Sequence, residues 1–160
     1  MRPDLLQPVL ERLLGERRAR MEDTKADLGR GERLHIASDS RRARRLAAQL
    51  YARELAIDLF ELDLDQLVSS HAGETEKHLD AFFTAAEAAG AVLLIDEADA
   101  LFGKRSEVRD AQDRYANLDV GYLLQKLEGY PGIVVLTTHR GAHIDAACAR
   151  DCTRVELSDG

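Results

Sequence analysis

The stretch Ala91-Val92-Leu93-Leu94-Ile95-Asp96-Glu97 decides the fold of this chain. Its first five residues are all apolar, so neither face of a strand built from them is suited to water. Such strands are typical of parallel sheets that helices cover on both sides. The run ends in two acids, Asp96 and Glu97, which the strand delivers to the carboxyl edge of the sheet. Sites in parallel α/β sheets lie beyond that edge, so the acid pair is the first candidate for a functional site.

The rest of the chain alternates between short apolar runs and longer segments with helical spacing. The expected strands are 34–37, 58–62, 91–95, 132–137 and 154–157, and the expected helices are 41–55, 74–89 and 116–130. Alternation of this kind implies parallel strands joined by right-handed crossovers. The sequence therefore predicts the α/β class, with a three-layer αβα sandwich around a parallel five-stranded sheet.

An amphipathic segment precedes this alternating region. Between residues 5 and 21, apolar side chains such as Leu6, Leu10 and Leu13 recur at helical spacing, which predicts a helix with one apolar face. The glycines that follow, Gly29 and Gly31, are typical of a turn. We therefore expect an N-terminal helical segment at 1–28 and a core domain at 29–160.

Length and composition limit the classes of protein to consider. The 160 residues suit one domain, and a hydrophobic fraction of 45% excludes a disordered chain. Two cysteines, Cys148 and Cys152, exclude a disulfide scaffold, and we expect both to be reduced thiols. The sequence has no apolar run of about 20 residues and no apolar leader, so we expect no membrane span and a cytoplasmic protein. A net charge of −7 argues against nucleic acid as a partner, although the arginines of 41–45 could contact phosphates.

Adjacent acids at the end of a buried strand require positive charge nearby. In a nucleotide-hydrolysing site, the first acid holds a magnesium ion and the second orients and deprotonates the attacking water. Asp96 and Glu97 suit these two roles in that order. The alternative is that the two acids only cap the next helix.

Residues 96–105, which read DEADALFGKR, strongly resemble the stretch around the Walker B acids of AAA+ ATPases, the P-loop NTPases of the AAA+ class. The similarity extends back to the GETEK of residues 73–77, which starts the family's second helix. It extends forward to residues 137–139, at the strand end called sensor 1, and to Arg150, near the arginine-finger region. The resemblance covers residues 29–157, and within the family it is to the AAA+ ATPases of bacterial contractile injection systems and to tandem-module relatives.

The resemblance implies ATP and Mg²⁺ as cofactors. In that reading Asp96 binds magnesium, Glu97 activates water, and His139 occupies the sensor 1 position. Arg150 is the finger that reaches the nucleotide of a neighbouring subunit. The resemblance also implies a ring of AAA+ subunits, identical or different, that acts on a protein substrate.

The phosphate loop departs from the family pattern. Where the family has GPPGTGKT, this chain has Ser38, Asp39, Ser40, Arg41, Arg42, Ala43, Arg44 and Arg45. Without glycine, the backbone nest that holds the β-phosphate is not expected to form. Arg44 replaces the lysine with a planar guanidinium, and Arg45 replaces the hydroxyl that binds magnesium. The arginines could form a reshaped anion site, or they could be a solvated basic helix face left after the site lost its purpose.

Other functional positions also depart from the family pattern. His71 stands where the family has the pore-loop aromatic that grips a polypeptide, and His139 replaces an asparagine. Asp151 follows Arg150 and would partly neutralise it. The sequence stops at residue 160, where the family continues into a helical lid, so we expect the lid to be absent.

Three functional hypotheses follow from these features. The first is a degenerate AAA+ module, a pseudo-ATPase, that acts through its interfaces with an active AAA+ partner. The second is a working ATPase that remodels protein complexes, in which Asp96 and Glu97 act together with Arg44 and Arg150. The third is a truncated fragment without a stable function. The loss of the loop glycines favours the first.

Overall fold

The computed structural model describes residues 6–23, 31–68, 71, 73–102, 118–142, 144 and 152–158. In this part of the chain five strands form one sheet, in the order β2-β3-β4-β1-β5, and all neighbouring strands are parallel. The strands are β1 (Arg33–Ala37), β2 (Leu59–Glu61), β3 (Val92–Ile95), β4 (Val134–Thr138) and β5 (Thr153–Glu156). The predicted five-stranded parallel sheet is confirmed, and each strand end lies within two residues of its expected position.

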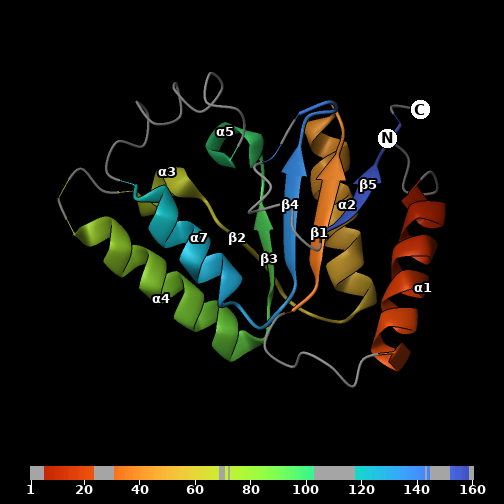
Figure 1. Cartoon of the computed structure of the whole chain (residues 1–160), viewed down its shortest axis with the longest axis horizontal. Coiled ribbons are helices and arrows are strands. Elements are labelled where there is room, and N and C mark those ends of the chain that lie inside the picture. Colours follow the sequence, from red (N-terminus) through yellow and green to blue (C-terminus); the bar gives the residue numbers. More distant parts are fainter. Residues whose placement is uncertain are drawn as a thin grey trace.

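Helices cover both faces of the sheet (Figure 1). They are α1 (Gln7–Asp23), α2 (Arg41–Glu54), α3 (Leu64–Leu67), α4 (Glu74–Ala89), α5 (Asp99–Phe102) and α7 (Val120–Glu128). The helix expected at 116–130 begins at Val120, because the Asp119 side chain accepts a hydrogen bond from the Tyr122 N–H and caps it there. The short helices α3 and α5 were not predicted, since four residues are too few to display a helical period.

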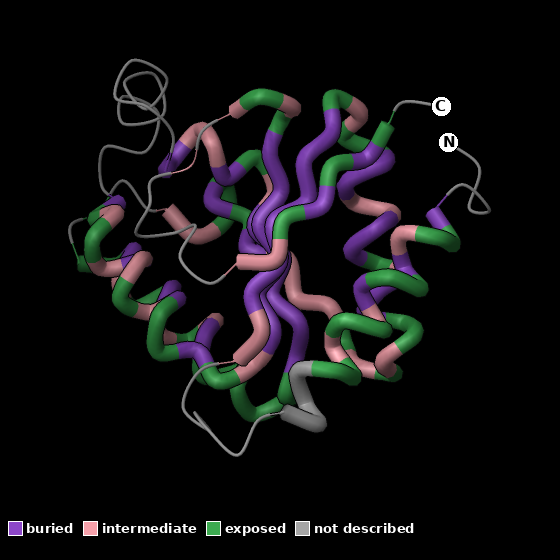
Figure 2. Tube along the Cα trace, turned by 45° about the vertical axis from the view of Figure 1, so that its right-hand side comes forward, coloured by how far each residue is buried: buried purple, intermediate pink, exposed green. Residues whose placement is uncertain are grey.

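The side chains of β3 separate the two halves of the core. Leu93 and Ile95 pack against α4 and α7, whereas Val92 and Leu94 pack against α1 and α2. All four are buried, as are all residues of β1 and β4, and these three strands form the purple interior of Figure 2. The purely apolar run therefore forms a central strand covered on both faces, as predicted.

Helix α1 packs against the rest of this chain. Leu10 and Leu13 of this helix, and Leu6 directly before it, are buried in the same cluster as residues of α2 and β1. The Glu32 carboxylate connects the two helices, because it accepts hydrogen bonds from Arg17 Nη1 at 2.5 Å and from the Tyr51 hydroxyl at 2.9 Å. The expected boundary between residues 28 and 29 falls outside the described residues and stays a prediction.

A buried arginine fixes the start of β1 to the turn before β4. Arg33 Nη2 donates to the carbonyls of Leu127 and Tyr130, both at 2.8 Å, and its Nη1 donates to the carbonyl of Gly132 at 2.8 Å. The two segments approach so closely that a Cβ on Gly31 would lie 1.8 Å from the Gly132 oxygen. Glycine is therefore required at position 31, and Arg33 satisfies carbonyls at the carboxyl end of α7.

Among the described helices, none has the length and apolar character needed to cross a membrane. Cys152 is half-buried directly before β5, and Cys148 lies outside the described residues.

Candidate functional site

The candidate site lies at the carboxyl edge of the sheet, where β1, β3 and β4 are neighbours. Segment 38–40 follows β1, Asp96 and Glu97 follow β3, and His139 follows β4. Helix α2 begins directly after segment 38–40, so its first turn stands beside the acid pair. The structure thus brings together every predicted site residue except Arg150, which lies outside the described residues.

Asp96 is held entirely by protein groups. Its Oδ2 accepts a hydrogen bond from Arg41 Nε at 2.9 Å, and its Oδ1 accepts one from the Thr137 hydroxyl at 2.5 Å. Arg44 Nε lies 3.5 Å from Oδ1, and Arg45 Nη1 lies 3.9 Å from Oδ2. Only 6% of the Asp96 side chain is exposed.

These contacts set the charge state of Asp96. Burial acts to raise the pKa of its carboxyl group, but the hydrogen bonds from Thr137 and Arg41 and the charge of Arg44 outweigh burial. The pKa therefore lies below its usual range, and the carboxylate is ionised at neutral pH.

Arg44 is the most deeply buried charged side chain at this edge, with no exposed surface. Its Nη1 donates to the Ser38 carbonyl at 2.6 Å, and its Nη2 lies 3.8 Å from Glu97 Oε1. Nε and Nη2 have no hydrogen-bond partner among the described residues, so only the ion pairs with the two acids compensate them. A buried guanidinium needs such compensation, which makes Asp96 and Glu97 its counter-ions.

The idea of a solvated basic helix face is wrong for Arg44 and incomplete for Arg41 and Arg45, which are partly exposed but paired with acids. Arg44 is buried, and Arg41 is hydrogen-bonded to Asp96. Arg45 forms a bidentate pair with Glu61, in which its Nη2 lies 2.6 Å from Oε2. The physical reason is that helix α2 starts next to two strands that end in acids, β2 with Glu61 and β3 just before Asp96. Arg42, which is exposed as Arg41 is, has no ion pair to a described residue.

The segment in place of the phosphate loop is short. Only residues 38–40 separate β1 from α2, because Ser40 caps the helix by accepting a hydrogen bond from the Ala43 N–H at 3.2 Å. The Ser40 N–H donates to the Ser38 hydroxyl oxygen, and the Ser38 N–H donates to the Thr138 carbonyl. The backbone N–H groups of Ser38, Ser40 and Ala43 are thus already bonded within the protein. Residues 41–43, which match the last part of the glycine-rich loop, form the first turn of a helix.

Asp39 connects this segment to the end of β4. Its Oδ1 accepts a hydrogen bond from the Arg140 N–H at 3.1 Å and lies 3.9 Å from His139 Nδ1. The predicted sensor residue His139 is thereby paired with an acid that stands in the place of the phosphate loop. Position 71 is described as well, and its histidine is exposed.

Glu97 combines exposure with an unusual backbone. Its φ is 57°, in the left-handed region that side chains other than glycine rarely adopt. Its N–H donates to the Thr137 hydroxyl oxygen at 3.2 Å, and half of its side chain is exposed. Asp99, two residues on, has a buried Oδ1 without a hydrogen-bond partner among the described residues, and burial raises its pKa.

Sequence reasoning missed Glu61, and it missed Thr137 as a hydrogen-bond donor to Asp96. Glu61 stands at the carboxyl end of the second expected strand, so the rule that pointed to Asp96 could also have found it. The hydroxyl of Thr137 has no comparable sequence signal. In the part of the chain that the structure describes, no three His, Cys, Asp or Glu side chains are grouped as metal ligands.

Comparisons with known proteins give a family match. The family model described as "ATPase family associated with various cellular activities (AAA)" matches residues 44–158. The match begins at Arg44 and so leaves out residues 38–43. The chain is also similar to the "Uncharacterized AAA family ATPase y4kL" of Sinorhizobium fredii (strain NBRC 101917 / NGR234), at 33% identity over 109 residues. That alignment includes 66% of this chain and 32% of the relative, so the chain spans about a third of the relative's length.

Proposed function

The chain belongs to the AAA family of ATPases, a family that binds nucleotides in general, and from this premise we propose that it is a non-hydrolysing AAA module. In this proposal the carboxyl edge of the sheet has lost its nucleotide chemistry, and the module acts through contacts with other AAA subunits. The observation that carries the proposal is the set of three guanidinium groups within 4 Å of Asp96.

The occupancy of Asp96 argues against a magnesium site. A carboxylate that holds Mg²⁺ presents an oxygen to the ion or to one of its waters. Here Thr137 and Arg44 face Oδ1, and Arg41 and Arg45 face Oδ2. A divalent cation would have to displace a guanidinium and would lie among the remaining positive charges. The donor set does not fit the ion that the family resemblance implies.

The surroundings argue equally against a triphosphate. A phosphate loop binds through successive unpaired N–H groups, whereas those of Ser38, Ser40 and Ala43 are bonded within the protein. The Asp39 carboxylate adds a negative charge to the same segment. Arg41, Arg44 and Arg45, which could attract an anion, are paired with the chain's own carboxylates.

The packing of the rest of the fold supports a function in binding other AAA subunits. In the described residues the hydrophobic core covers both faces of the sheet, and the arginine–aspartate cluster lies at the edge where a nucleotide would bind. Such a module keeps its shape without a ligand, which suits a subunit or regulator that other AAA subunits bind.

The test is calorimetric titration of the full chain with ATP, with and without Mg²⁺, at ATP concentrations up to about 1 mM. We expect no saturable heat, and no phosphate release above that of buffer. Saturable binding that disappears in Asp96→Asn but persists in Asp58→Asn, an exposed acid at the other end of the sheet, would overturn the proposal in favour of a working ATPase.

The contact role needs its own measurement. Sedimentation of the chain with an intact AAA ATPase from the same organism is expected to give a complex whose mass does not change when nucleotide is removed. Failure to associate with any such ATPase would contradict this part of the proposal.

A further inference from the structure

A second feature lies near the opposite edge of the sheet, between the carboxyl-terminal halves of α4 and α7. It is a pocket of about 440 Å³, within the size range of ligand pockets. The residues that line it are Phe83, Thr84, Glu87, Tyr122, Gln125, Lys126, Gly129 and Tyr130. None of these residues takes part in the site around Asp96.

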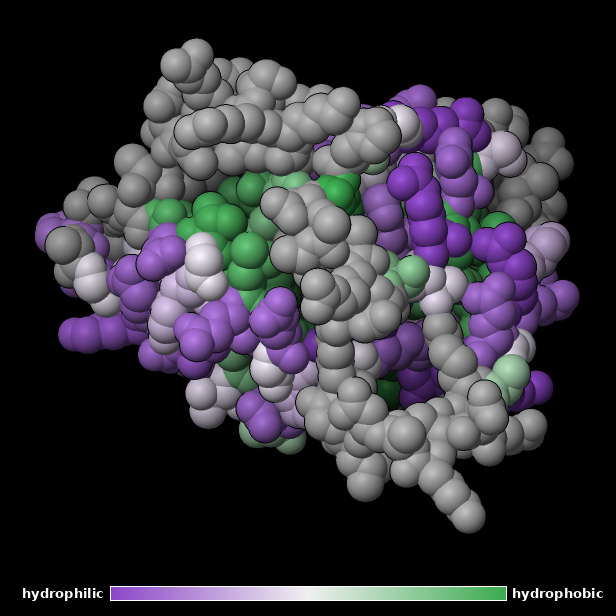
Figure 3. Space-filling model, in the orientation of Figure 1, coloured by the Kyte–Doolittle hydropathy of each residue, from purple (hydrophilic) through white to green (hydrophobic). Residues whose placement is uncertain are grey.

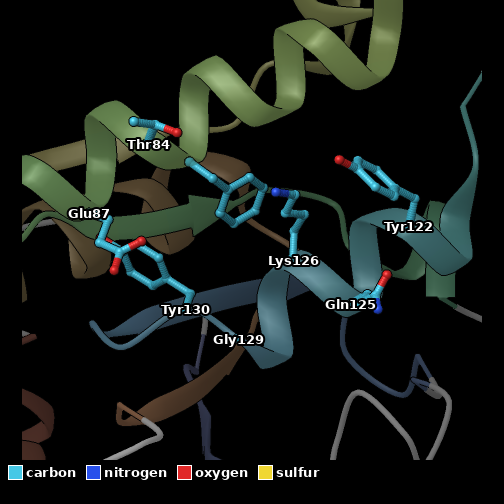
Figure 4. Close-up of a pocket in the computed structure, with 8 residues that line it drawn as sticks. Thr84, Glu87, Tyr122, Gln125, Lys126, Gly129 and Tyr130 are labelled. Carbon is cyan, nitrogen blue, oxygen red and sulfur yellow. The ribbon is translucent and has the colours of Figure 1, made fainter. Parts of the chain in front are cut away.

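The two ends of the pocket differ in charge. At one end, Lys126 Nζ lies 2.8 Å from Asp80 Oδ1 and 5.5 Å from the centre of the Tyr122 ring, and the Tyr122 hydroxyl donates to the same carboxylate. That lysine is therefore neutralised. At the other end stands Glu87, close to Tyr130 and Gly129 and apart from Tyr122 (Figure 4). The Glu87 carboxylate has no ion pair or hydrogen bond to any described residue.

Glu87 is placed unfavourably for the free protein. It lies in the last turn of α4, which ends at Ala89 and contains no basic residue in that turn. A helix C-terminus carries partial negative charge, so an acid there is destabilising and a cation is favoured. Helix α7 also ends at this pocket, with Gly129 at its C-cap. The negative end of α4 and the Glu87 carboxylate thus face this space, whereas the carbonyls at the end of α7 accept hydrogen bonds from Arg33.

The floor of this end is aromatic and rigid. Tyr130 is 2% exposed, and its hydroxyl donates to the carbonyls of Ala91, at 2.5 Å, and Ala86, at 3.2 Å. The Phe83 ring packs edge-on against it, with 6.1 Å between ring centres. Burial, together with the nearby Glu87 charge, raises the pKa of Tyr130, which agrees with a carboxylate held close to the ring. Because both rings are buried, they form a firm wall, and the group open to a ligand at this end is the Glu87 carboxylate, which pairs with guanidinium or ammonium groups.

We propose that this pocket is a docking site for an arginine-bearing segment of a partner protein, whose guanidinium pairs with Glu87 and lies against the Tyr130 end. The net charge of −7 for the whole chain favours a basic partner as well. The outer surface over α4 is mainly hydrophilic, which suits a polar interface with one anchoring side chain (Figure 3).

The experiment uses the full chain labelled with ¹⁵N and the probe acetyl-Ala-Arg-Ala-amide. We expect saturable shifts of the Glu87, Gln125 and Gly129 amide signals with a dissociation constant in the millimolar range, because a single exposed ion pair is weak. The same peptide with citrulline, which is neutral and of equal size, should not shift them. Glu87→Gln should weaken binding about fivefold or more, whereas Glu128→Gln, an exposed acid that does not line the pocket, should leave it unchanged.

Other outcomes overturn the proposal. These are the absence of a saturable shift, an equal response to citrulline, persistence of binding in Glu87→Gln, or preference for acetyl-Ala-Glu-Ala-amide. Concentration-dependent shifts of the same signals without peptide would assign the pocket to a second copy of this chain instead. Because the pocket and Asp96 lie near opposite edges of the sheet, the ATP titration and this titration succeed or fail independently.

Discussion

Acidification from pH 7.5 to pH 5 should destabilise this protein by about 2 kcal/mol through one side chain, His35. His35 lies in the central strand β1 and is 4% exposed. Burial, and secondly the positive charge of Arg154 on the neighbouring strand β5, lower its pKa from 6.5 to about 4. In the folded protein the imidazole is therefore neutral at pH 5.

The hydrogen bonds around His35 agree with a neutral ring. Its Nε2 lies 2.8 Å from the Thr138 hydroxyl, which donates its own hydrogen to the His139 carbonyl at 2.9 Å. The Thr138 oxygen therefore accepts, and His35 Nε2 carries the proton; this tautomer is assigned from the hydrogen-bond network.

The sign and the size of this change in the free energy of unfolding follow from proton linkage. A histidine whose folded pKa is lowered binds fewer protons in the folded than in the unfolded state below about pH 6.5, so stability falls as the pH falls. With pKa values of 6.5 unfolded and about 4 folded, the loss is about 2 kcal/mol at pH 5 and levels off at about 3 kcal/mol below pH 4. Above pH 7.5 the contribution does not change.

The assay is urea unfolding at pH 7.5 and at pH 5, for the wild type and for His35→Gln. Glutamine keeps an N–H donor for Thr138 and cannot be protonated in this range. The variant should lose about 2 kcal/mol less than the wild type between the two pH values, since other titrating groups contribute equally to both proteins. An equal loss in the two proteins would refute the assignment of the pH dependence to His35.

Three further substitutions test the structural account. Asp96→Asn should lower the free energy of unfolding, measured in urea, by about 3 kcal/mol, because it removes a counter-ion from buried Arg44. A loss below about 0.5 kcal/mol, which is typical of a solvated acid, would contradict this. Ala56→Gly should raise stability by about 1 kcal/mol, because φ is 54° there, whereas Glu97→Gly at φ 57° should gain less than Ala56→Gly or lose stability, because it also removes a counter-ion from Arg44; an equal gain in the two variants would refute that role of Glu97. Arg33→Met should lower the free energy of unfolding by about 3 kcal/mol, because it leaves buried carbonyls at the end of α7 without a donor. An unchanged melting temperature would refute the role of Arg33 as their donor.

The sheet could be predicted because its signals are local. The run 91–95 has a pattern that only a doubly covered strand satisfies, and the acids that follow it mark the carboxyl edge. The sequence did not predict which surface α1 contacts through Leu10, because an amphipathic helix needs a partner surface but does not identify it. The same holds for Arg33, whose carbonyl acceptors lie at the end of α7 and directly after it, about a hundred residues away in sequence.

The sequence predicted which residues lie at the candidate site, but it did not predict which side chains contact one another. That residues 38–45 and Asp96 meet at one edge follows from the order of strands and helices. The start of α2 at Arg41 agrees with the helix expected at 41–55, and Ser40 caps it there. What could not be read from the sequence is that this first turn places the Arg41 and Arg44 side chains against Asp96.

The charges at this edge explain why the altered loop and the retained acids belong together. Arg41, Arg44 and Arg45 face Asp96, Glu97 and Glu61, so three positive and three negative side chains balance one another. In a working site a magnesium ion and a lysine offset the acids and the phosphates jointly. Here Arg41, Arg44 and Arg45 offset the acids alone, and of the four arginines only Arg42 lacks an acid partner among the described residues. The acids that look like the best evidence for catalysis are, on this argument, retained because the buried guanidinium of Arg44 requires them.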